Sequence, residues 1–189
     1  MQEQKKREAY RCLVIITDSH IREQLCEFLA DSHIPVYYQM HGIGTASSEW
    51  LELCGLGSIQ KSITLCFIPN GRKKILLAEM NQALSLHKKG TGIAVSIPMN
   101  GMQGFLYKLL NEHTAESDGE EVEKEVKKMS EPITHAMILV TINQGYSDAV
   151  MNTARAAGAT GGTILKGLRC SPGKSAVIFG ITIQEEQEI

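Results

Sequence analysis

"HAMILVTINQGYSDAVMNTARAAGATGGTILKGLR", residues 135–169, contains two strand-like runs with a helical segment between them. Residues 137–141 are short and apolar, which is typical of a buried strand. Apolar residues then recur at helical spacing from Tyr146 onward, and Gly158 ends the helix because glycine accepts a positive φ. A second strand-like run reaches Gly167. The pattern predicts a strand, a helix and a second strand.

The same order of elements occurs near the N-terminus. Residues 12–17 form an apolar run rich in β-branched side chains, which predicts a buried strand. Asp18 and Ser19 offer an N-cap for the helix that follows, and this helix should end by Pro35. The next strand-like run ends in glycines, and Gly42 corresponds to Gly167. We interpret the chain as an internal duplication.

The first half continues with two more strands and a helix between them. Residues 62–69 and 93–99 are strand-like, and residues 71–90 predict an amphipathic helix that ends at Gly90. Its predicted apolar face consists of Ile75, Leu76, Met80, Ala83 and Leu84. The order β-α-β-β-α-β is the split βαβ, ferredoxin-like arrangement, in which two helices cover one face of an antiparallel sheet. The other face is expected to be bare and apolar, and to need a partner.

These patterns divide the chain into three parts. Residues 10–107 form a complete ferredoxin-like domain, residues 108–133 a charged linker, and residues 134–189 an incomplete second domain. The predicted fold class is therefore α+β, with a duplicated ferredoxin-like fold whose second copy is truncated. We expect either that the chain continues beyond Ile189 or that another subunit completes the second copy.

Composition narrows the functional classes. The 189 residues include 19 Lys and Arg against 21 Asp and Glu, for a formal net charge of −2, so a general nucleic-acid footprint is not expected. No apolar run approaches the roughly 18 residues of a membrane span, and no membrane insertion is expected. The five cysteines are scattered and never form Cys-x-x-Cys, which indicates reduced thiols in a cytoplasmic protein.

The tripeptide Gly173-Lys174-Ser175 resembles the end of a phosphate-binding P-loop, but its context excludes one. The motif needs a glycine where this chain has Leu168, and a helix where a strand-like run follows Ser175. No Ser-His-Asp arrangement, paired carboxylates or activated cysteine is recognisable. We therefore expect no enzymatic activity.

Residues 135–169 resemble the opening strand, helix and second strand of the PII nitrogen-regulatory signalling family and its PII-like relatives, including the Gly-Ala-Thr-Gly-Gly helix exit. The sequence HGIG, residues 41–44, resembles the family's glycine motif where the long T-loop begins, and KKGTGI, residues 88–93, resembles its B-loop. The resemblance covers nearly the whole chain, as one complete and one incomplete repeat. Family members usually have a single repeat, so the tandem arrangement departs from the family pattern.

The resemblance implies a PII-like signal-transduction protein rather than an enzyme. It implies a homotrimer whose sheets pack toward a common centre and whose inter-subunit clefts bind adenine nucleotides. It also implies that the T-loop, reshaped by the ligand, contacts a target protein such as a transporter or an enzyme. No cofactor is required, and an adenine nucleotide is the expected effector.

The resemblance also assigns effector-binding residues, namely Gly42, Gly44, Lys88, Lys89, Gly90 and Gly92 in the first half, and Lys166, Gly167 and Arg169 in the second. The family's phosphate-binding lysine would fall at Ile93, and its C-terminal arginines have no counterpart. Lys88 and Lys89 either replace that lysine or simply favour a helix C-terminus. The glycines have an alternative role in plain turns, and the second-half cations as solvated loop residues. Trp50 is predicted either to contact a partner protein or to pack into the core.

A divalent-metal-binding ferredoxin-like trimer is the alternative function, because a related trimer family handles divalent cations. The six histidines could supply ligands, yet none pair at i,i+3 or i,i+4, and no Cys/His cluster occurs. We therefore assign no metal-binding residue.

Overall fold

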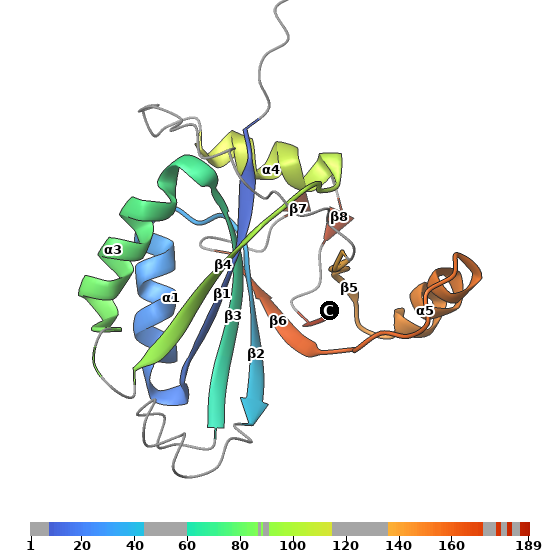
Figure 1. Cartoon of the computed structure of the whole chain (residues 1–189), viewed down its shortest axis with the longest axis horizontal. Helices are drawn as coiled ribbons and strands as arrows, with labels where there is room; N and C mark the ends of the chain where they lie inside the picture. The colour runs from blue at the N-terminus through green and yellow to red at the C-terminus, as the bar shows by residue number, and fades with distance from the viewer. Residues whose placement is uncertain are drawn as a thin grey trace, which may run out of the picture.

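The computed structural model describes residues 8–43, 60–86, 88, 91–114, 136–171, 177–178, 181–182 and 186–189. The protein is a mixed α+β structure built on a seven-stranded sheet with the strand order β4-β1-β3-β2-β6-β9-β5 (Figure 1). All pairs in this sheet are antiparallel.

The first half has the predicted β-α-β-β-α-β order. Its elements are β1 (Tyr10–Asp18), the short helix η1 (Ser19–Ile21), α1 (Arg22–Asp31), β2 (Tyr37–Ile43), β3 (Gln60–Pro69), the short helix η2 (Asn70–Arg72), α3 (Lys73–Leu84) and β4 (Gly92–Pro98). The helix α1 ends before Pro35, as predicted. Asp18 makes no cap hydrogen bond, contrary to the prediction, because its carboxylate pairs with Lys61 on β3.

The helices α1 and α3 pack on one face of the sheet (Figure 1). In α3 the buried side chains are Leu76, Met80 and Leu84, which recur every fourth residue and so form one stripe. Ile75 was predicted to be on this face but is 59% exposed, because it lies beside the stripe. The helix ends at Leu84, where Ser85 takes a left-handed φ of 53°, and not at Gly90, which lies outside the described residues.

The opposite face of the sheet was predicted to be bare, and this prediction is wrong. An additional helix, α4 (Gly104–Thr114), partly covers that face. Leu110 of α4 is buried against a second apolar cluster, which includes Tyr38 of β2 and Phe67 of β3. Ile93 and Val95 on β4 remain 44% and 48% exposed. Residues 108–114 thus belong to a helix and not to a linker, while residues 115–135 lie outside the described residues.

The second half continues the sheet through β6 (Lys166–Cys170), which pairs with β2. Its other elements are β5 (Ile142–Asn143), α5 (Ser147–Ala156), β9 (Glu186–Glu188) and a separate two-stranded sheet of β7 (Val177–Ile178) and β8 (Ile181–Thr182). Figure 1 shows α5 standing apart from the sheet, on the far side of β6 from α1 and α3. Gly158 follows α5 with a φ of 99°, as predicted.

Two strand predictions in the second half are wrong. Residues 137–141 are described but form no strand, and Ile138 is 85% exposed. The strand β5 begins only at Ile142 because β9 provides partners for just two of its residues. The strand-like run after Ser175 is divided between β7 and β8, which pair with each other.

Candidate functional site

The predicted effector residues that the structure describes form separate groups. Gly92 begins β4 and Lys88 is exposed in the turn before it, whereas Gly42 lies in β2 and Lys166, Gly167 and Arg169 lie in β6. The predicted residues Gly44, Trp50, Lys89 and Gly90 lie outside the described residues.

The end of β2 and the start of β6 meet at a cavity of about 250 Å³. This cavity joins His41, which precedes the first-half glycine, to Lys166 and Gly167 of the second half. The structure therefore brings His41, the first residue of the first-half glycine motif, beside Lys166 and Gly167 of the second half. The complete lining is Arg22, Gln39, Met40, His41, Gln144, Lys166, Gly167 and Leu168.

Gln39 holds Arg22 at this cavity. The Nε of Arg22 donates to the carboxamide oxygen of Gln39 at 3.0 Å, and the Nε2 of Gln39 donates to the Sγ of Cys26 at 3.1 Å. Gln39 is only 4% exposed, so the amide is a fixed support for the guanidinium. Burial raises the pKa of the adjacent Tyr37, and the thiols of Cys26 and Cys170 raise it further. The phenol therefore stays neutral near Arg22 at physiological pH.

The cavity has an excess of positive charge. Arg22 and Lys166 carry this charge, the imidazole of His41 also lines the cavity, and the described lining contains no carboxylate. Glu188 lies directly opposite Lys166 in the β6–β9 register. Its Oε2 accepts a hydrogen bond of 3.1 Å from the backbone N–H of Ser147, at the N-terminus of α5. A carboxylate is favoured there by the exposed N–H groups of the helix.

Strand packing explains why residues 167 and 92 are glycines. A Cβ at Gly167 would lie 2.8 Å from the carbonyl oxygen of Gln39, which the backbone cannot accommodate without moving. A Cβ at Gly92 would lie 2.6 Å from the carbonyl oxygen of Ile16. Gly42 is less constrained, because its nearest contact would be the flexible end of Ile63 at 2.9 Å. Gly92 and Gly167 are therefore explained by the close approach of neighbouring strands, without any contact to a ligand.

Gly92 and the small cavity lie at the same end of the sheet but not together. Through the strand registers Gly92 is level with Thr17, Ser62 and His41. Three strand spacings of about 4.8 Å separate Gly92 from His41, or roughly 14 Å. Within one chain, Lys88 and Gly92 therefore do not line the cavity.

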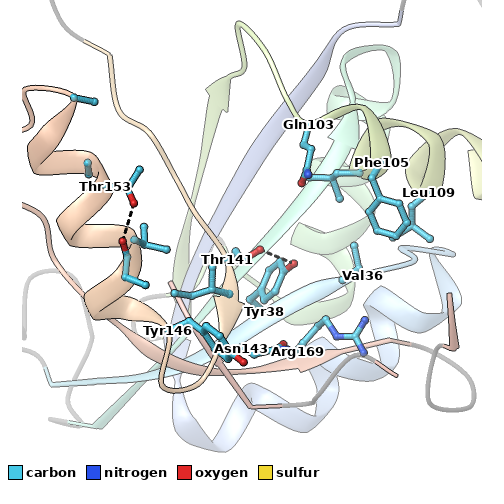
Figure 2. Close-up of a pocket in the computed structure, with 16 residues that line it drawn as sticks. Val36, Tyr38, Gln103, Phe105, Leu109, Thr141, Asn143, Tyr146, Thr153 and Arg169 are labelled. Carbon is cyan, nitrogen blue, oxygen red and sulfur yellow. Dashed lines mark hydrogen bonds between the residues drawn. The ribbon is translucent and has the colours of Figure 1, made fainter. Parts of the chain in front are cut away.

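Arg169 lies away from Lys166, although the sequence predicted a shared anion site. The two residues are three positions apart on β6, and successive side chains of a strand alternate between faces. Arg169 faces a larger cavity of about 800 Å³ on the α4 side of the sheet, shown in Figure 2. The two second-half cations thus belong to different cavities.

Sequence reasoning missed Arg22, Gln39 and His41 as site residues. Gln39 and His41 are two positions apart on β2, so their side chains lie on the same face of the sheet, the one that α1 covers. Arg22 is the first residue of α1 and contacts Gln39 on this face. The alternation could have been read from the sequence. The proximity of Lys166 could not, because it depends on the β2–β6 pairing.

The described part of the chain contains no group of three or more His, Cys, Asp or Glu side chains arranged to hold a metal ion. It also contains no helix long and apolar enough to cross a membrane.

No protein-family model and no curated protein matches this chain. Among solved structures, a Bacillus cereus protein related to NIF3 is similar over 50% of this chain and 26% of its own, with 14% identity and a TM-score of 0.38. The divalent ion tolerance protein CutA1 from Ehrlichia chaffeensis is similar over 57% of this chain and 96% of its own, with 9% identity and a TM-score of 0.39. At these values neither likeness defines the fold or the function of this chain.

Proposed function

We propose that this protein is a PII-like regulatory protein that binds an anionic effector, an adenine nucleotide, with its phosphates at the cavity between β2 and β6. The observation that carries the proposal is the meeting of Arg22, His41 and Lys166 at a cavity whose described lining has no carboxylate. Lys and Arg side chains form charge-assisted hydrogen bonds with phosphate oxygens. The protein is proposed to act as a regulator and not as an enzyme.

The size of the cavity suits part of a nucleotide. A volume of about 250 Å³ is below the usual range for whole-ligand pockets, which is roughly 300–1,000 Å³. The phosphates occupy the cavity in this proposal, and the base lies outside it, against another subunit. In this proposal the segment of residues 44–59, between β2 and β3 in the sequence, senses the ligand and contacts the target protein, a transporter or an enzyme.

A homotrimer would complete this arrangement. Val14, Ile93 and Val95 form an apolar patch on the sheet face that α4 leaves open, with Val14 directly opposite Val95 in the register. Burying such a patch between subunits is favourable, at about 25 cal/mol per Å² of apolar surface. The same packing would bring Lys88 and Gly92 of one subunit toward the cavity of another.

Strand order supports the proposed duplication. In the first half, β3 lies between β1 and β2, and in the second half β9 lies between β5 and β6. In each half a helix connects the two outer strands of such a trio, α1 in one and α5 in the other. The corresponding strands β2 and β6 pair antiparallel at the centre, which gives the six strands an approximate two-fold arrangement.

Titration calorimetry with ATP, ADP and AMP tests the proposal. Lys166→Gln and Arg22→Gln should each weaken binding of the preferred nucleotide about tenfold or more, since a hydrogen bond to a charged group contributes roughly 1.5–3 kcal/mol. Lys108→Gln is the matched control, because Lys108 is exposed on α4 and does not line the cavity. Equal affinities for all four proteins, or no nucleotide binding by the wild type, would refute the proposal.

A further inference from the structure

Two extended segments of the second half, residues 136–140 and 160–165, border a cavity of about 610 Å³. The first segment leads into β5 and the second into β6, and the structure assigns neither to a strand. Residues 137–140 and 164–165 are large and apolar, and each is at least 37% exposed. The helix α5 lines the same cavity, for example with Met151. An apolar surface of this extent, open to water, is typical of an interaction site.

The strands beside this cavity have the same relative register as the corresponding strands of the first half. Lys61 of β3 lies opposite both Asp18 of β1 and Gly42 of β2, which are 24 residues apart in the sequence. In the second half, one residue of β9 lies opposite both Ile142 of β5 and Lys166 of β6, which are also 24 residues apart. The strand β9 therefore has the position in its half that β3 has in the first half.

The central strand is much longer in the first half than in the second. Beyond Lys61, β3 continues for eight residues to Pro69. Beyond Glu188, which is the counterpart of Lys61, the pairing that the structure describes stops at Ile189. The backbone N–H and carbonyl of Ile189 pair with those of Leu165 at 2.8 and 2.7 Å, and Ile189 also lines the cavity. The cavity thus corresponds to the place that the rest of β3 fills in the first half.

We propose that this cavity is a strand slot, filled by residues 176–183 of a second copy of this chain. A strand that runs there in the direction of β9 would form antiparallel hydrogen bonds with residues 137–141 on one side and 160–164 on the other. Its side chains on one face would cover α5 and remove apolar surface from water. A small apolar molecule would fill the same volume, but it would make no hydrogen bonds with the two extended backbones.

The sequence AVIFGITI, residues 176–183, has the properties that the strand slot requires. It contains no charged residue and is rich in β-branched side chains, as a strand that is apolar on both faces should be. Among the described lining residues of the slot, Glu188 is the single charged one, and it lies at the end next to β9. The segment follows β6 in the chain as β3 follows β2, and its described parts, β7 and β8, pair with each other outside the main sheet.

Chain connectivity explains why the occupant comes from a second copy. A strand antiparallel to both sides of the slot would place residue 183 about 26 Å beyond Ile189, since each of its residues extends the strand by about 3.3 Å. The same chain would then have to return to Glu186, which is paired with Leu168, through only two residues. Two connecting residues span at most about 11 Å. While β9 is paired, the segment therefore fills the slot of another chain, by exchange of an identical element between protomers.

The strand slot is separate from the other proposed surfaces. None of its described lining residues also lines the cavity between β2 and β6. It also shares no residue with the apolar patch of Val14, Ile93 and Val95. The slot can therefore be altered without changing the lining of the nucleotide cavity.

Hydrogen exchange of the full chain at a series of protein concentrations, read by mass spectrometry, tests the inference. In concentrated solution, residues 137–141 and 160–164 should exchange about tenfold or more slowly than in dilute solution, because strand pairing protects their N–H groups. Met151→Asp, which places a charge in the slot, should abolish this slowing. Ile178→Pro should abolish it too, because proline lacks the N–H that the occupant strand donates. The control Asn152→Asp places the same carboxylate at an exposed position of α5, outside the lining.

Three results would overturn the inference. The first is no slowing at any concentration. The second is slowing that does not depend on concentration, which would place a segment of the same chain in the slot. The third is the same slowing in Met151→Asp or in Ile178→Pro as in Asn152→Asp.

A synthetic peptide of residues 175–184 keeps the test decisive if a variant fails to fold. Added to dilute wild-type protein, the peptide should slow exchange in both segments, and unchanged exchange at saturating peptide would overturn the inference. ATP affinity should be the same in Met151→Asp and Asn152→Asp, which separates this inference from the nucleotide proposal.

Discussion

Replacing Lys61 with methionine removes one half of a buried ion pair at the end of the sheet that carries the cavity between β2 and β6. The Nζ of Lys61 contacts the Oδ1 of Asp18, and the two side chains are 5% and 8% exposed. The residues lie directly opposite each other on β3 and β1, and Lys61 is also opposite Gly42 on β2. The ion pair therefore helps to fix the relative position of three strands beside the cavity.

The expected loss of stability follows from this burial. A methionine at position 61 leaves the Asp18 carboxylate, which is only 8% exposed, without its Lys61 partner. Breaking a buried ion pair by removing one partner costs about 3–5 kcal/mol. For a chain of this length that corresponds to a fall in melting temperature of roughly 6–20 °C.

Urea unfolding followed by circular dichroism measures this loss. The double variant Asp18→Asn/Lys61→Met removes both charges, so it should lose less stability than the sum of the two single variants. A loss of about 1 kcal/mol or less for Lys61→Met, which is the value of an exposed pair, would refute the reasoning. Strict additivity of the two single changes would refute it equally.

Three further predictions concern packing, pH and helix capping. Gly92→Ala should destabilise the protein by about 1–3 kcal/mol in urea unfolding. The reason is that the φ of Gly92 is 157° and that a Cβ there would lie 2.6 Å from the backbone oxygen of Ile16. The control Gly101→Ala should change stability little, because a Cβ at Gly101 would contact nothing. Burial raises the pKa of the Cys66 thiol above its usual value of 9.0. The free energy of unfolding should therefore fall as the pH rises above 9, by up to about 1.4 kcal/mol per pH unit. Cys66→Ala should reduce this slope in urea unfolding measured at several pH values. Glu188→Gln weakens the interaction with Ser147 and should destabilise α5 by about 0.3–1 kcal/mol, measured by hydrogen exchange, and unchanged exchange in α5 would contradict it.

The first half was predictable because its patterns are local. The apolar run of β1, the strand-like run of β2 that ends in glycines and the i,i+4 stripe of α3 each indicate one element, and the structure confirms their order. The wrong prediction for Ile75 also comes from using the local pattern alone. The sequence shows that Ile75 is next to the apolar stripe of α3, but only the packing angle of the helix decides whether it is buried. The early end of α3 depends on Ser85 adopting a left-handed conformation, which is uncommon for serine.

The second half was less predictable because its strands depend on distant partners. Residues 137–141 have the composition of a strand, yet a strand forms only where a neighbour supplies hydrogen bonds, and β9 reaches just Ile142 and Asn143. The helix α4 was missed because residues 108–114 were assigned to the charged segment that follows them. Arg22 was not predicted as a site residue because its position depends on contact with Gln39, 17 residues away.

The most direct test of the proposed function is a crystal structure of the protein grown with ATP or with whichever adenine nucleotide binds best in solution. If the proposed function is right, phosphate oxygens lie within hydrogen-bonding distance of Lys166 and Arg22, in the cavity between β2 and β6. A nucleotide bound with its phosphates elsewhere, or a cavity without nucleotide at saturating concentration, would contradict it.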